Sequence, residues 1–288
     1  MCHVPQIEIG YIPRAAFIPF HTRKARWSAI AAHRRAGKTV ACIADLVDSA
    51  LRHQGMEPRF AYVAPTFTQA KDIAWGYLKR FTTALPAISV SESELSVTLM
   101  NGGRIRLYGA ENYDRMRGLY LDGVILDEYA LIDPRAWPEV IRPALSDRRG
   151  WAVFMGTPKG QNDFYAKVQE ARASDDWYSL VLKSSNSGIL PAEELADAQK
   201  SMSQEQFDQE YECSFEAAVP GAYYGKLMRA AEYGGRITRV PHDPAMQVET
   251  WWDLGVGDAT AIWFSQRAPG GEIRVIDYYE AQGEGLPH

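Results

Sequence analysis

The stretch WSAIAAHRRAGKT, residues 27–39, decides the fold. Its first six residues are small or apolar, as in a buried strand of a parallel sheet, and the turn after them ends in Gly-Lys-Thr. A helical pattern follows at once, with apolar residues three and four apart at Val40, Ile43, Ala44, Val47, Ala50 and Leu51. A strand, a basic turn and a helix in this order predict a phosphate-binding loop.

Each residue of this loop is a candidate nucleotide contact: Ala32, His33, Arg34, Arg35, Ala36, Gly37, Lys38 and Thr39. Backbone N–H groups of such a loop surround the phosphates, the Lys side chain pairs with the β and γ oxygens, and the Thr hydroxyl is a ligand of Mg²⁺. The usual pattern begins with Gly, and Ala32 is small enough to keep the turn. Either Arg34 or Arg35 could stabilise transition-state charge as an arginine finger in cis, while the other is structural.

A second strand ends in two acids, in the stretch GVILDE at 123–128. A buried parallel strand presents residues after its last position at the carboxyl edge of the sheet, where ligands bind in such folds. We expect Asp127 to hold Mg²⁺ through water and Glu128 to activate the attacking water. A water-activating Glu favours hydrolysis over transfer to a bound acceptor.

A third strand end carries Thr157, in FMGTP at 154–158. A Thr at this place could sense the γ-phosphate and couple hydrolysis to a moving element. The alternative is an ordinary Gly-Thr-Pro turn from a strand into a loop.

The rest of the first 183 residues alternates strands and helices. Strands are expected at 59–64 and 151–156, helices at 66–81 and near 161–173, and a hairpin around Asn101-Gly102-Gly103. This alternation predicts a three-layer α/β sandwich with a mainly parallel sheet.

Beyond residue 183 the pattern changes twice. Polar helices are expected from about 184 to 218, followed by a connection rich in Gly and Pro up to 244. Short strands of antiparallel character then follow in VETWWDLG, ATAIWFSQ and EIRVIDYYE. The expected domains are a P-loop ATPase core (1–183), a lid and linker (184–244) and the start of a further domain (245–288).

The 288 residues have a net charge of −5, which argues weakly against a simple nucleic-acid-binding module. The charge is uneven, because seven cations and no acid occur between Gly10 and Ala44, while eight acids and one Lys occur between Pro191 and Glu216. We interpret the acidic run as a solvated surface. Three cysteines without a close pair and the lack of a long apolar run predict a soluble intracellular protein.

The motifs AHRRAGKT, YVAPTFTQAKDIAW, RGLYLDGVILDEYA, FMGTPKG and WWDLGVGDATAI occur in the order seen in large terminase subunits of tailed double-stranded DNA bacteriophages. From about Tyr11 to Glu280 the chain resembles this family. The resemblance implies an ATP-driven motor that moves viral DNA into the procapsid. It also implies a fold of the additional-strand, catalytic-glutamate (ASCE) P-loop type with a small helical lid, followed by the first strands of an RNase H-like nuclease.

By position, the resemblance assigns Lys38 and Thr39 to phosphate and Mg²⁺, Asp127 to Mg²⁺, Glu128 to catalysis and Thr157 to coupling. Arg34 matches the cis finger and Arg117 a possible finger acting on a neighbouring subunit. In the family an adenine-contacting Gln often lies upstream of the loop; here Gln6 is the only upstream Gln and His21 lies nearer the loop, so the residue in this role stays open.

In the nuclease part, Asp253 matches the first metal-binding aspartate, with Mg²⁺ or Mn²⁺ as the ion. Asp258, Asp277 and Glu280 are the nearby acids. Because the family's other essential acids lie in sequence that would follow His288, we expect this chain alone to be a poor nuclease.

The resemblance also implies partners: double-stranded viral DNA, the small terminase subunit, the portal protein of the procapsid and further copies of the chain in a ring, without a membrane. The place of action would be the cytoplasm of the infected bacterial host. Two alternatives stay open: another DNA-dependent P-loop ATPase of the helicase or recombination type, and an inactive prophage remnant that only binds or assembles.

Overall fold

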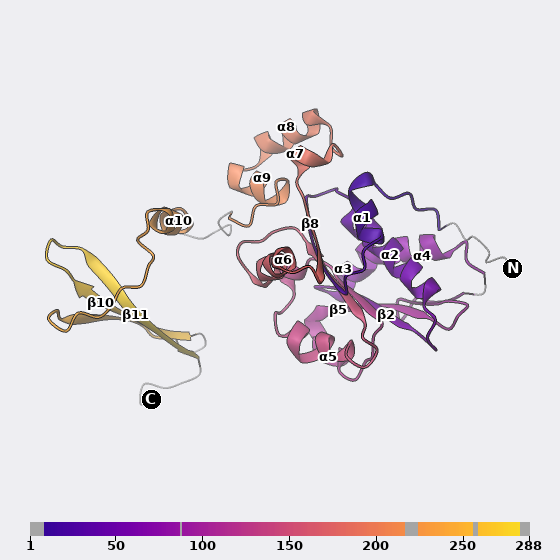
Figure 1. The fold of residues 1–288 in the computed structure, drawn as a ribbon, viewed down its shortest axis with the longest axis horizontal. Helices are drawn as coiled ribbons and strands as arrows, with labels where there is room; N and C mark the ends of the chain where they lie inside the picture. Colours follow the sequence, from indigo (N-terminus) through magenta and orange to yellow (C-terminus); the bar gives the residue numbers. More distant parts are fainter. Residues whose placement is uncertain (1–8, 87, 217–223, 256–258, 283–288) are drawn as a thin grey trace. The chain divides into compact units, whose positions relative to one another are not determined.

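The predicted strands of the first 183 residues join in one sheet of eight strands, in the order β3-β4-β5-β2-β6-β7-β1-β8 (Figure 1). The structure is a computed structural model and describes residues 9–86, 88–216, 224–255 and 259–282. The chain divides into two compact units, Met1–Gly221 and Ala222–His288. The described strands of the sheet are β1 (Trp27–Ala32), β2 (Arg59–Ala64), β3 (Ser89–Ser91), β4 (Ser96–Thr98), β5 (Arg104–Gly109), β6 (Gly123–Leu126), β7 (Trp151–Gly156) and β8 (Trp177–Leu182).

The six strands from β5 to β8 in this order are parallel, and β4 pairs antiparallel with β5 in the predicted hairpin. β3 and β8 are strands that sequence reasoning missed. β7 lies between β1, which leads into the phosphate loop, and β6, which ends in the acid pair. This is the additional-strand arrangement that the ASCE class predicts.

Helices cover both faces of the sheet, as the three-layer prediction requires. In β1 the alternate residues Ile30 and Ala32 pack in one core, and Ala29 and Ala31 pack in the other. Figure 1 shows α2 and α4 on one side of the sheet and α5 and α6 on the other. The helical segments of the first unit up to residue 173 are η1 (Ala15–Phe17), α1 (Ile18–His21), α2 (Lys38–Arg52), α3 (Phe67–Ala70), η2 (Lys71–Trp75), α4 (Gly76–Thr82), η3 (Ala110–Met116), η4 (Tyr129–Leu131), η5 (Trp137–Ile141), α5 (Arg142–Ala144) and α6 (Asp163–Ala173).

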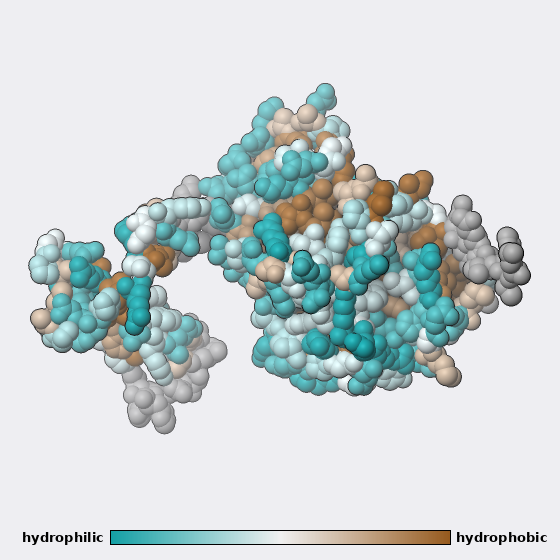
Figure 2. Space-filling view, viewed as in Figure 1, coloured by the Kyte–Doolittle hydropathy of each residue, from teal (hydrophilic) through white to brown (hydrophobic). Residues whose placement is uncertain are grey.

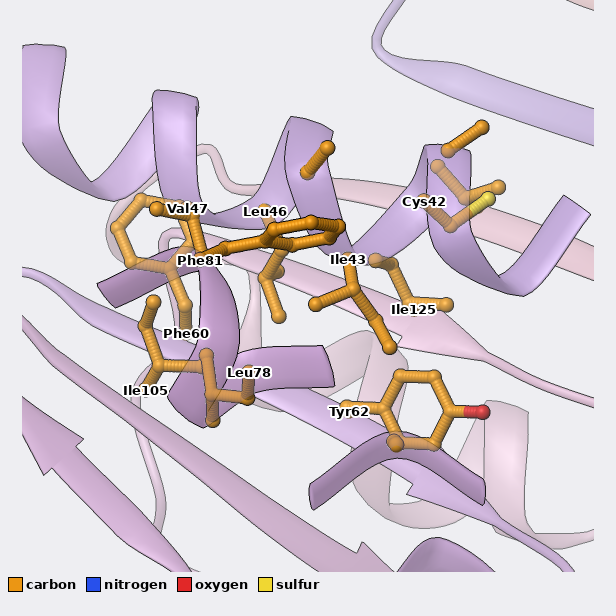
Figure 3. Close-up of a cluster of buried hydrophobic side chains, with 14 of the residues drawn as sticks. Cys42, Ile43, Leu46, Val47, Phe60, Tyr62, Leu78, Phe81, Ile105 and Ile125 are labelled. Atoms are coloured by element: carbon orange, nitrogen blue, oxygen red, sulfur yellow. The ribbon is translucent and has the colours of Figure 1, made fainter. Parts of the chain in front are cut away.

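The core on the α2 side forms because α2 has a continuous apolar stripe. Ile43, Leu46 and Val47 of this helix are at most 1% exposed and pack over Phe60 and Phe81 (Figure 3). The predicted helix at 66–81 is present as α3, a π-helical turn η2 and α4, so one extra residue is accommodated within it.

A buried ion pair fixes α2 to the segment before β1. Arg23 donates from both Nη atoms to the two oxygens of Asp45, at 2.8 and 2.7 Å. Burial raises the pKa of Asp45, but hydrogen bonds from His21 and Arg23 outweigh this effect and the pKa is lowered. The segment that precedes the phosphate loop is therefore held against the helix that follows it.

Polar helices follow β8, as predicted, and we call residues 184–216 the lid segment. Ser203 begins its last helix with a capping box, since its hydroxyl accepts from the Gln206 N–H and the Gln206 side chain accepts from the Ser203 N–H. Hydrophilic residues dominate the visible face of these helices (Figure 2). They are α7 (Ser184–Ser187), α8 (Ala192–Ser201) and α9 (Gln204–Glu210).

The second unit contains a three-stranded antiparallel sheet in the order β11-β10-β9, as the sequence predicts. Trp251, Trp263 and Tyr278 lie opposite one another on neighbouring strands and form an aromatic row across the sheet. The described elements of this unit are α10 (Gly225–Tyr233), β9 (Val248–Asp253), β10 (Ala259–Arg267) and β11 (Ile273–Gln282). Among the described residues of the chain, no helix has the length and apolar character to cross a membrane.

The two units do not coincide with the three predicted domains, because the lid segment belongs to the first unit. The boundaries 1–183, 184–244 and 245–288 therefore remain a prediction.

Candidate nucleotide-binding site

The phosphate loop is a short turn between β1 and α2. His33 follows the last residue of β1, Ala32, and the turn closes with a hydrogen bond from the Ala36 N–H to the His33 carbonyl at 3.2 Å. Gly37 has φ +94°, a backbone conformation that favours glycine. Lys38 is the first residue of α2, so the free N–H groups of the helix start lie at the loop, as phosphate binding requires.

Arg14 supports the loop from outside. Its Nη1 donates to the carbonyl oxygens of Arg35 and Ala36, at 3.0 and 2.7 Å. A Cβ atom on Gly37 would lie 3.3 Å from the same nitrogen, a tight contact that the Arg14 side chain would have to relieve by a small shift. Sequence reasoning missed Arg14, because no local pattern connects it with a loop 21 residues later.

The His33 side chain connects the phosphate loop with the lid segment, and its predicted contact with nucleotide remains a prediction. It is fully buried, and its Nδ1 lies 2.6 Å from the Arg34 carbonyl oxygen, while its Nε2 lies 2.9 Å from Oγ of Ser187 in the lid segment. Burial lowers the pKa of His33. A neutral ring with the proton on Nδ1 fits these contacts, since a carbonyl oxygen only accepts.

Glu128 and Thr157 follow the neighbouring strands β6 and β7, Lys38 begins the helix after β1, and the three side chains meet beside the loop. Lys38 Nζ lies 3.4 Å from Oε1 of Glu128 and 3.4 Å from Oγ1 of Thr157. The Thr157 N–H donates to Oε2 of Glu128 over 3.4 Å. The structure thus brings together the residues predicted for phosphate binding, catalysis and coupling at the carboxyl edge of the sheet.

Glu128 stands in a strained backbone position. Its φ of +45° is in the left-handed region, which costs a non-glycine residue about 1–2 kcal/mol. Gly156 makes room for it, because a Cβ there would lie 3.3 Å from the Glu128 Cα and 3.5 Å from Oε2. With 29% of its side chain exposed, the carboxylate can reach solvent water.

Asp127 is buried behind Glu128 and is 2% exposed. One oxygen accepts from the Tyr62 hydroxyl, which points away from the apolar cluster that holds the Tyr62 ring (Figure 3). The other oxygen accepts from the Glu128 N–H at 2.9 Å. Burial, and then the nearby Glu128 carboxylate, raise the pKa of Asp127 to about 6.

The donor set suits Mg²⁺, which prefers oxygen ligands. The Asp127 carboxylate is buried without a cation within ion-pair distance among the described residues, so a metal ion would compensate its charge. Thr39 lies at the start of α2 and can supply a hydroxyl. The pairing of Thr39 and Asp127 on one ion remains a prediction.

A cavity of about 230 Å³ opens next to the loop, beyond Gly37. Its aromatic and aliphatic walls resemble those that accept a flat base in small-molecule sites. His21 does not line it but shares a hydrogen bond of 3.0 Å with the Tyr11 hydroxyl, and Gln6 lies outside the described residues. The lining residues are Gly10, Tyr11, Ile12, Arg14, Phe17, Gly37, Val40, Arg80 and Phe81.

The two predicted arginine fingers have partners within the first unit. Arg34 Nε lies 2.8 Å from Oε2 of Glu210 in the lid segment. Arg117 Nε and Nη2 contact Asp114 at 2.7 Å and Glu139 at 3.1 Å. With 67% and 54% of their side chains exposed, both arginines can exchange partners, and the cis and trans roles remain predictions.

The expectation of a solvated acidic surface at 191–216 is wrong for two residues. Glu210 pairs with Arg34 with only 18% of its side chain exposed, and Glu212 accepts from the hydroxyls of Ser184 and Ser185 at 2.5 and 2.6 Å. Burial raises the pKa of Glu212, but these hydrogen bonds give a net lowering. A charge run in sequence does not show which of its members face the phosphate loop.

Asp253, the last residue of β9, and Glu280 of β11 both pair with Ala261 of the central strand β10, one on each side. The two carboxylates therefore share a face of the sheet, with one strand between them. Asp277 lies opposite Phe264, and Asp258 is outside the described residues. The described part of the chain holds no group of three His, Cys, Asp or Glu residues that could bind a metal ion. The assignment of Asp253 remains a prediction.

The phosphate loop follows β1, the acid pair follows β6, and Thr157 follows β7, which lies between these two strands. This arrangement defines a P-loop ATPase fold of the additional-strand class. No family model matches the chain. Two curated proteins are similar to it: the large terminase subunits of Thermus virus P23-45 and of Thermus phage G20c. Each is 30% identical over 177 residues, which are 54% of this chain and 36% of the relative. The chain spans about a third of the length of these relatives.

Solved structures of phage large terminases are also similar to this chain. The large terminase ATPase domain of Thermus phage P74-26 is 26% identical, with a TM-score of 0.64 over 72% of this chain and 95% of that domain. The large terminase of another thermophilic bacteriophage, 16% identical, shares the fold with a TM-score of 0.62 over 94% of this chain and 68% of that one, and it is also known in complex with ATP-γ-S. The chain is thus similar to phage large terminase subunits over part of their length, and it shares the fold of the large terminase ATPase domain of Thermus phage P74-26. The expected resemblance is confirmed, and the helicase or recombination alternative is not favoured.

Proposed function

We propose that the chain hydrolyses ATP and thereby drives double-stranded viral DNA into a procapsid, as the motor part of a large terminase subunit. The observation that carries the proposal is the meeting of Lys38, at the start of α2, with Glu128 and Thr157, which follow two neighbouring strands, next to a loop whose helix start can bind phosphate. The relatives' names and the ATP-γ-S complex of the thermophilic phage terminase support it.

The geometry suggests a role for each residue. Lys38 would leave Glu128 for the β- and γ-phosphates, and this would release the carboxylate to orient water for attack on the γ-phosphate. Thr39 and Asp127 would hold Mg²⁺, which supplies positive charge to the phosphate oxygens. The adenine ring would lie in the cavity beside Gly37, between Tyr11 and Phe81.

The lid segment would transmit the result. His33, Arg34 and Lys159 all contact it, and Thr157 lies two residues before Lys159. Movement of this segment against the sheet would act on duplex DNA, with Arg117 reaching a neighbouring copy in a ring. DNA would be held through its phosphates without sequence preference, so binding would weaken steeply with salt.

The proposed partners are double-stranded viral DNA, the small terminase subunit and the portal protein, and the proposed place is the cytoplasm of the infected bacterial host. The sheet of the second unit would belong to an RNase H-like nuclease, in which Asp253 binds Mg²⁺ or Mn²⁺. Glu280 is placed to assist it, because both carboxylates lie on one face of the sheet.

The test is ATP hydrolysis measured together with nucleotide binding in the parent and two variants. Lys38→Ala should lose both, whereas Glu128→Gln should bind ATP like the parent and lose turnover by about a hundredfold or more. Lys24→Ala, which removes an exposed cation of the same basic stretch, is the matched control and should hydrolyse ATP at the parent rate.

If Glu128→Gln hydrolyses ATP at the parent rate, the catalytic assignment is wrong. A folded parent that binds ATP without hydrolysing it would favour the inactive remnant instead. Plasmid incubated in parallel with Mg²⁺ or Mn²⁺ tests the nuclease part, and we expect hydrolysis of ATP without efficient nicking.

A further inference from the structure

A second basic site lies on the face of the sheet opposite α2, near the amino edge. Arg59 and Arg104 are the first residues of β2 and β5 and are partners in the register, so their side chains lie next to each other on one face. Arg106 is two residues further along β5 and therefore lies on the same face. The nucleotide site lies at the opposite, carboxyl edge, about 17 Å away along a six-residue strand such as β2.

These three arginines line a cavity of about 170 Å³ together with Tyr108 and Tyr120. The guanidinium carbon of Arg106 lies 5.1 Å from the centre of the Tyr108 ring, and that of Arg59 lies 6.0 Å from the centre of the Tyr120 ring. Tyr120 is 45% exposed. The cavity thus combines guanidinium groups with an aromatic side chain that reaches the molecular surface.

The arginines of this cavity differ in their partners. Arg59 pairs with Glu57 at 2.9 Å and Arg104 pairs with Glu94, whereas no acid of the described residues lies within ion-pair distance of Arg106. The Nε atoms of Arg59 and Arg106 are buried and donate to no acceptor in the described structure, which is uncommon for a buried donor. If either guanidinium group turned toward an oxyanion in the cavity, that oxyanion would supply the missing acceptor.

We propose that this cavity is a docking site for an acidic side chain of a protein partner, with Arg106 as the cation that receives the carboxylate. Guanidinium groups bind carboxylates through paired, charge-assisted hydrogen bonds. One cation without a partner matches the single charge of a Glu or Asp side chain. Tyr and Arg are also the residues enriched among the strongest contacts of protein interfaces, and the exposed Tyr120 ring lies beside Arg59 and 4.5 Å from the guanidinium carbon of Arg148.

The shape of the site favours an acidic peptide over duplex DNA. A Glu or Asp carboxylate stands at the end of a narrow methylene stem and can enter a cavity of about 170 Å³. A DNA phosphate lies between two sugars in a continuous backbone, so proteins contact it from an open surface. Because the site is separate from the nucleotide site, peptide binding would not depend on ATP or on its hydrolysis.

The test is a calorimetric titration of the full chain, without nucleotide, with a tetraglutamate peptide that is blocked at both ends. The parent should bind this peptide and should not bind a blocked tetraglutamine peptide. Arg106→Gln should weaken binding about tenfold or more, the range expected for lost hydrogen bonds to a charged group. Arg106→Lys keeps the charge but loses the planar donor pair, so it should weaken binding about threefold or more, and it serves if the Gln variant does not fold.

Arg172→Gln is the matched control, because it removes an exposed arginine of α6 that does not line the cavity, and its affinity should equal that of the parent. An equal loss in Arg172→Gln and Arg106→Gln would indicate general charge attraction and overturn the proposal. A parent that binds neither peptide, or both equally, would also overturn it. With a short DNA duplex as the titrant, Arg106→Gln should bind like the parent; weaker duplex binding with unchanged peptide binding would assign the site to DNA instead.

Discussion

Replacing Asp127 by Asn should stabilise the first unit and abolish ATP turnover. The raised pKa of this carboxyl, about 6 against 3.8, measures how strongly folding opposes its charge at neutral pH. About two pKa units at about 1.4 kcal/mol each give about 3 kcal/mol. The Asn side chain has one acceptor oxygen, so one of the hydrogen bonds from Tyr62 and the Glu128 N–H is lost, at about 1 kcal/mol. The net gain in unfolding free energy is about 2 kcal/mol.

The pH dependence of this gain separates the charge from other effects. Between the unfolded pKa of 3.8 and the folded pKa of about 6, the folded state binds more protons, so the contribution of Asp127 to stability falls as the pH rises through this window. At about pH 4.5 the opposition to the charge is reduced to about 1 kcal/mol, and the Asn variant should gain nothing.

Urea unfolding of parent and variant at about pH 7.5 and about pH 4.5, without nucleotide or Mg²⁺, measures both values. Asp147→Asn, at an exposed acid of the same unit, should change neither. A loss of stability in Asp127→Asn at the higher pH, or the same gain at both, would refute the reasoning. A concurrent loss of Mg²⁺-dependent ATP hydrolysis would show that this buried charge opposes stability and serves the site.

Three further outcomes follow from the described contacts. Asp45→Asn should lower the unfolding free energy, measured in urea, by about 3–5 kcal/mol, because it leaves Arg23 buried without its carboxylate partner. In the parent protein the contribution of this pair is lost as the pH falls from 3.8 through the lowered pKa of folded Asp45. An unchanged unfolding midpoint in the variant would contradict the role of the pair. Gly156→Ala should reduce kcat for ATP hydrolysis about tenfold with stability nearly unchanged, since the new Cβ would displace Glu128 slightly. Full activity would show that the site accommodates this Cβ without moving Glu128. The rate of ATP hydrolysis at limiting Mg²⁺ should fall as the pH drops below about 6, as Asp127 takes up a proton, and a flat profile down to about pH 5 would exclude it as a ligand.

The sequence was sufficient for the parts of the site that follow strand ends. Glu128 and Thr157 lie just beyond buried apolar runs, and Lys38 begins the helix after the turn that follows such a run. Parallel strands place residues of this kind at one edge of the sheet. The three-layer arrangement follows from the alternation of strands and helices. These features depend on local patterns and general rules of topology.

What the sequence could not show depends on pairing across long distances. Tyr62 reaches Asp127 because β2 pairs with β6 in a particular register, with Tyr62 opposite Ile125. Arg14 reaches the phosphate loop from an irregular segment. The sequence does not distinguish Glu210 from the other seven acids of its run, and only the fold shows that it pairs with Arg34. No periodicity carries this information, since the side chains meet through tertiary packing alone.

The position of β1 in the sheet has a consequence for biosynthesis. β1 carries the phosphate loop and pairs on one side with β7 and on the other with β8, which ends 150 residues after β1. At a synthesis rate of about 5–20 residues per second, β1 is made about 8–30 seconds before β8, its second partner, has been synthesised. Until β7 and then β8 are synthesised, the edges of this small, apolar strand lack these partners and are open to other chains. The strand that leads into the phosphate loop is thus among the last of the first unit to be fully paired, and overproduction in a cell should favour aggregation through its exposed edges.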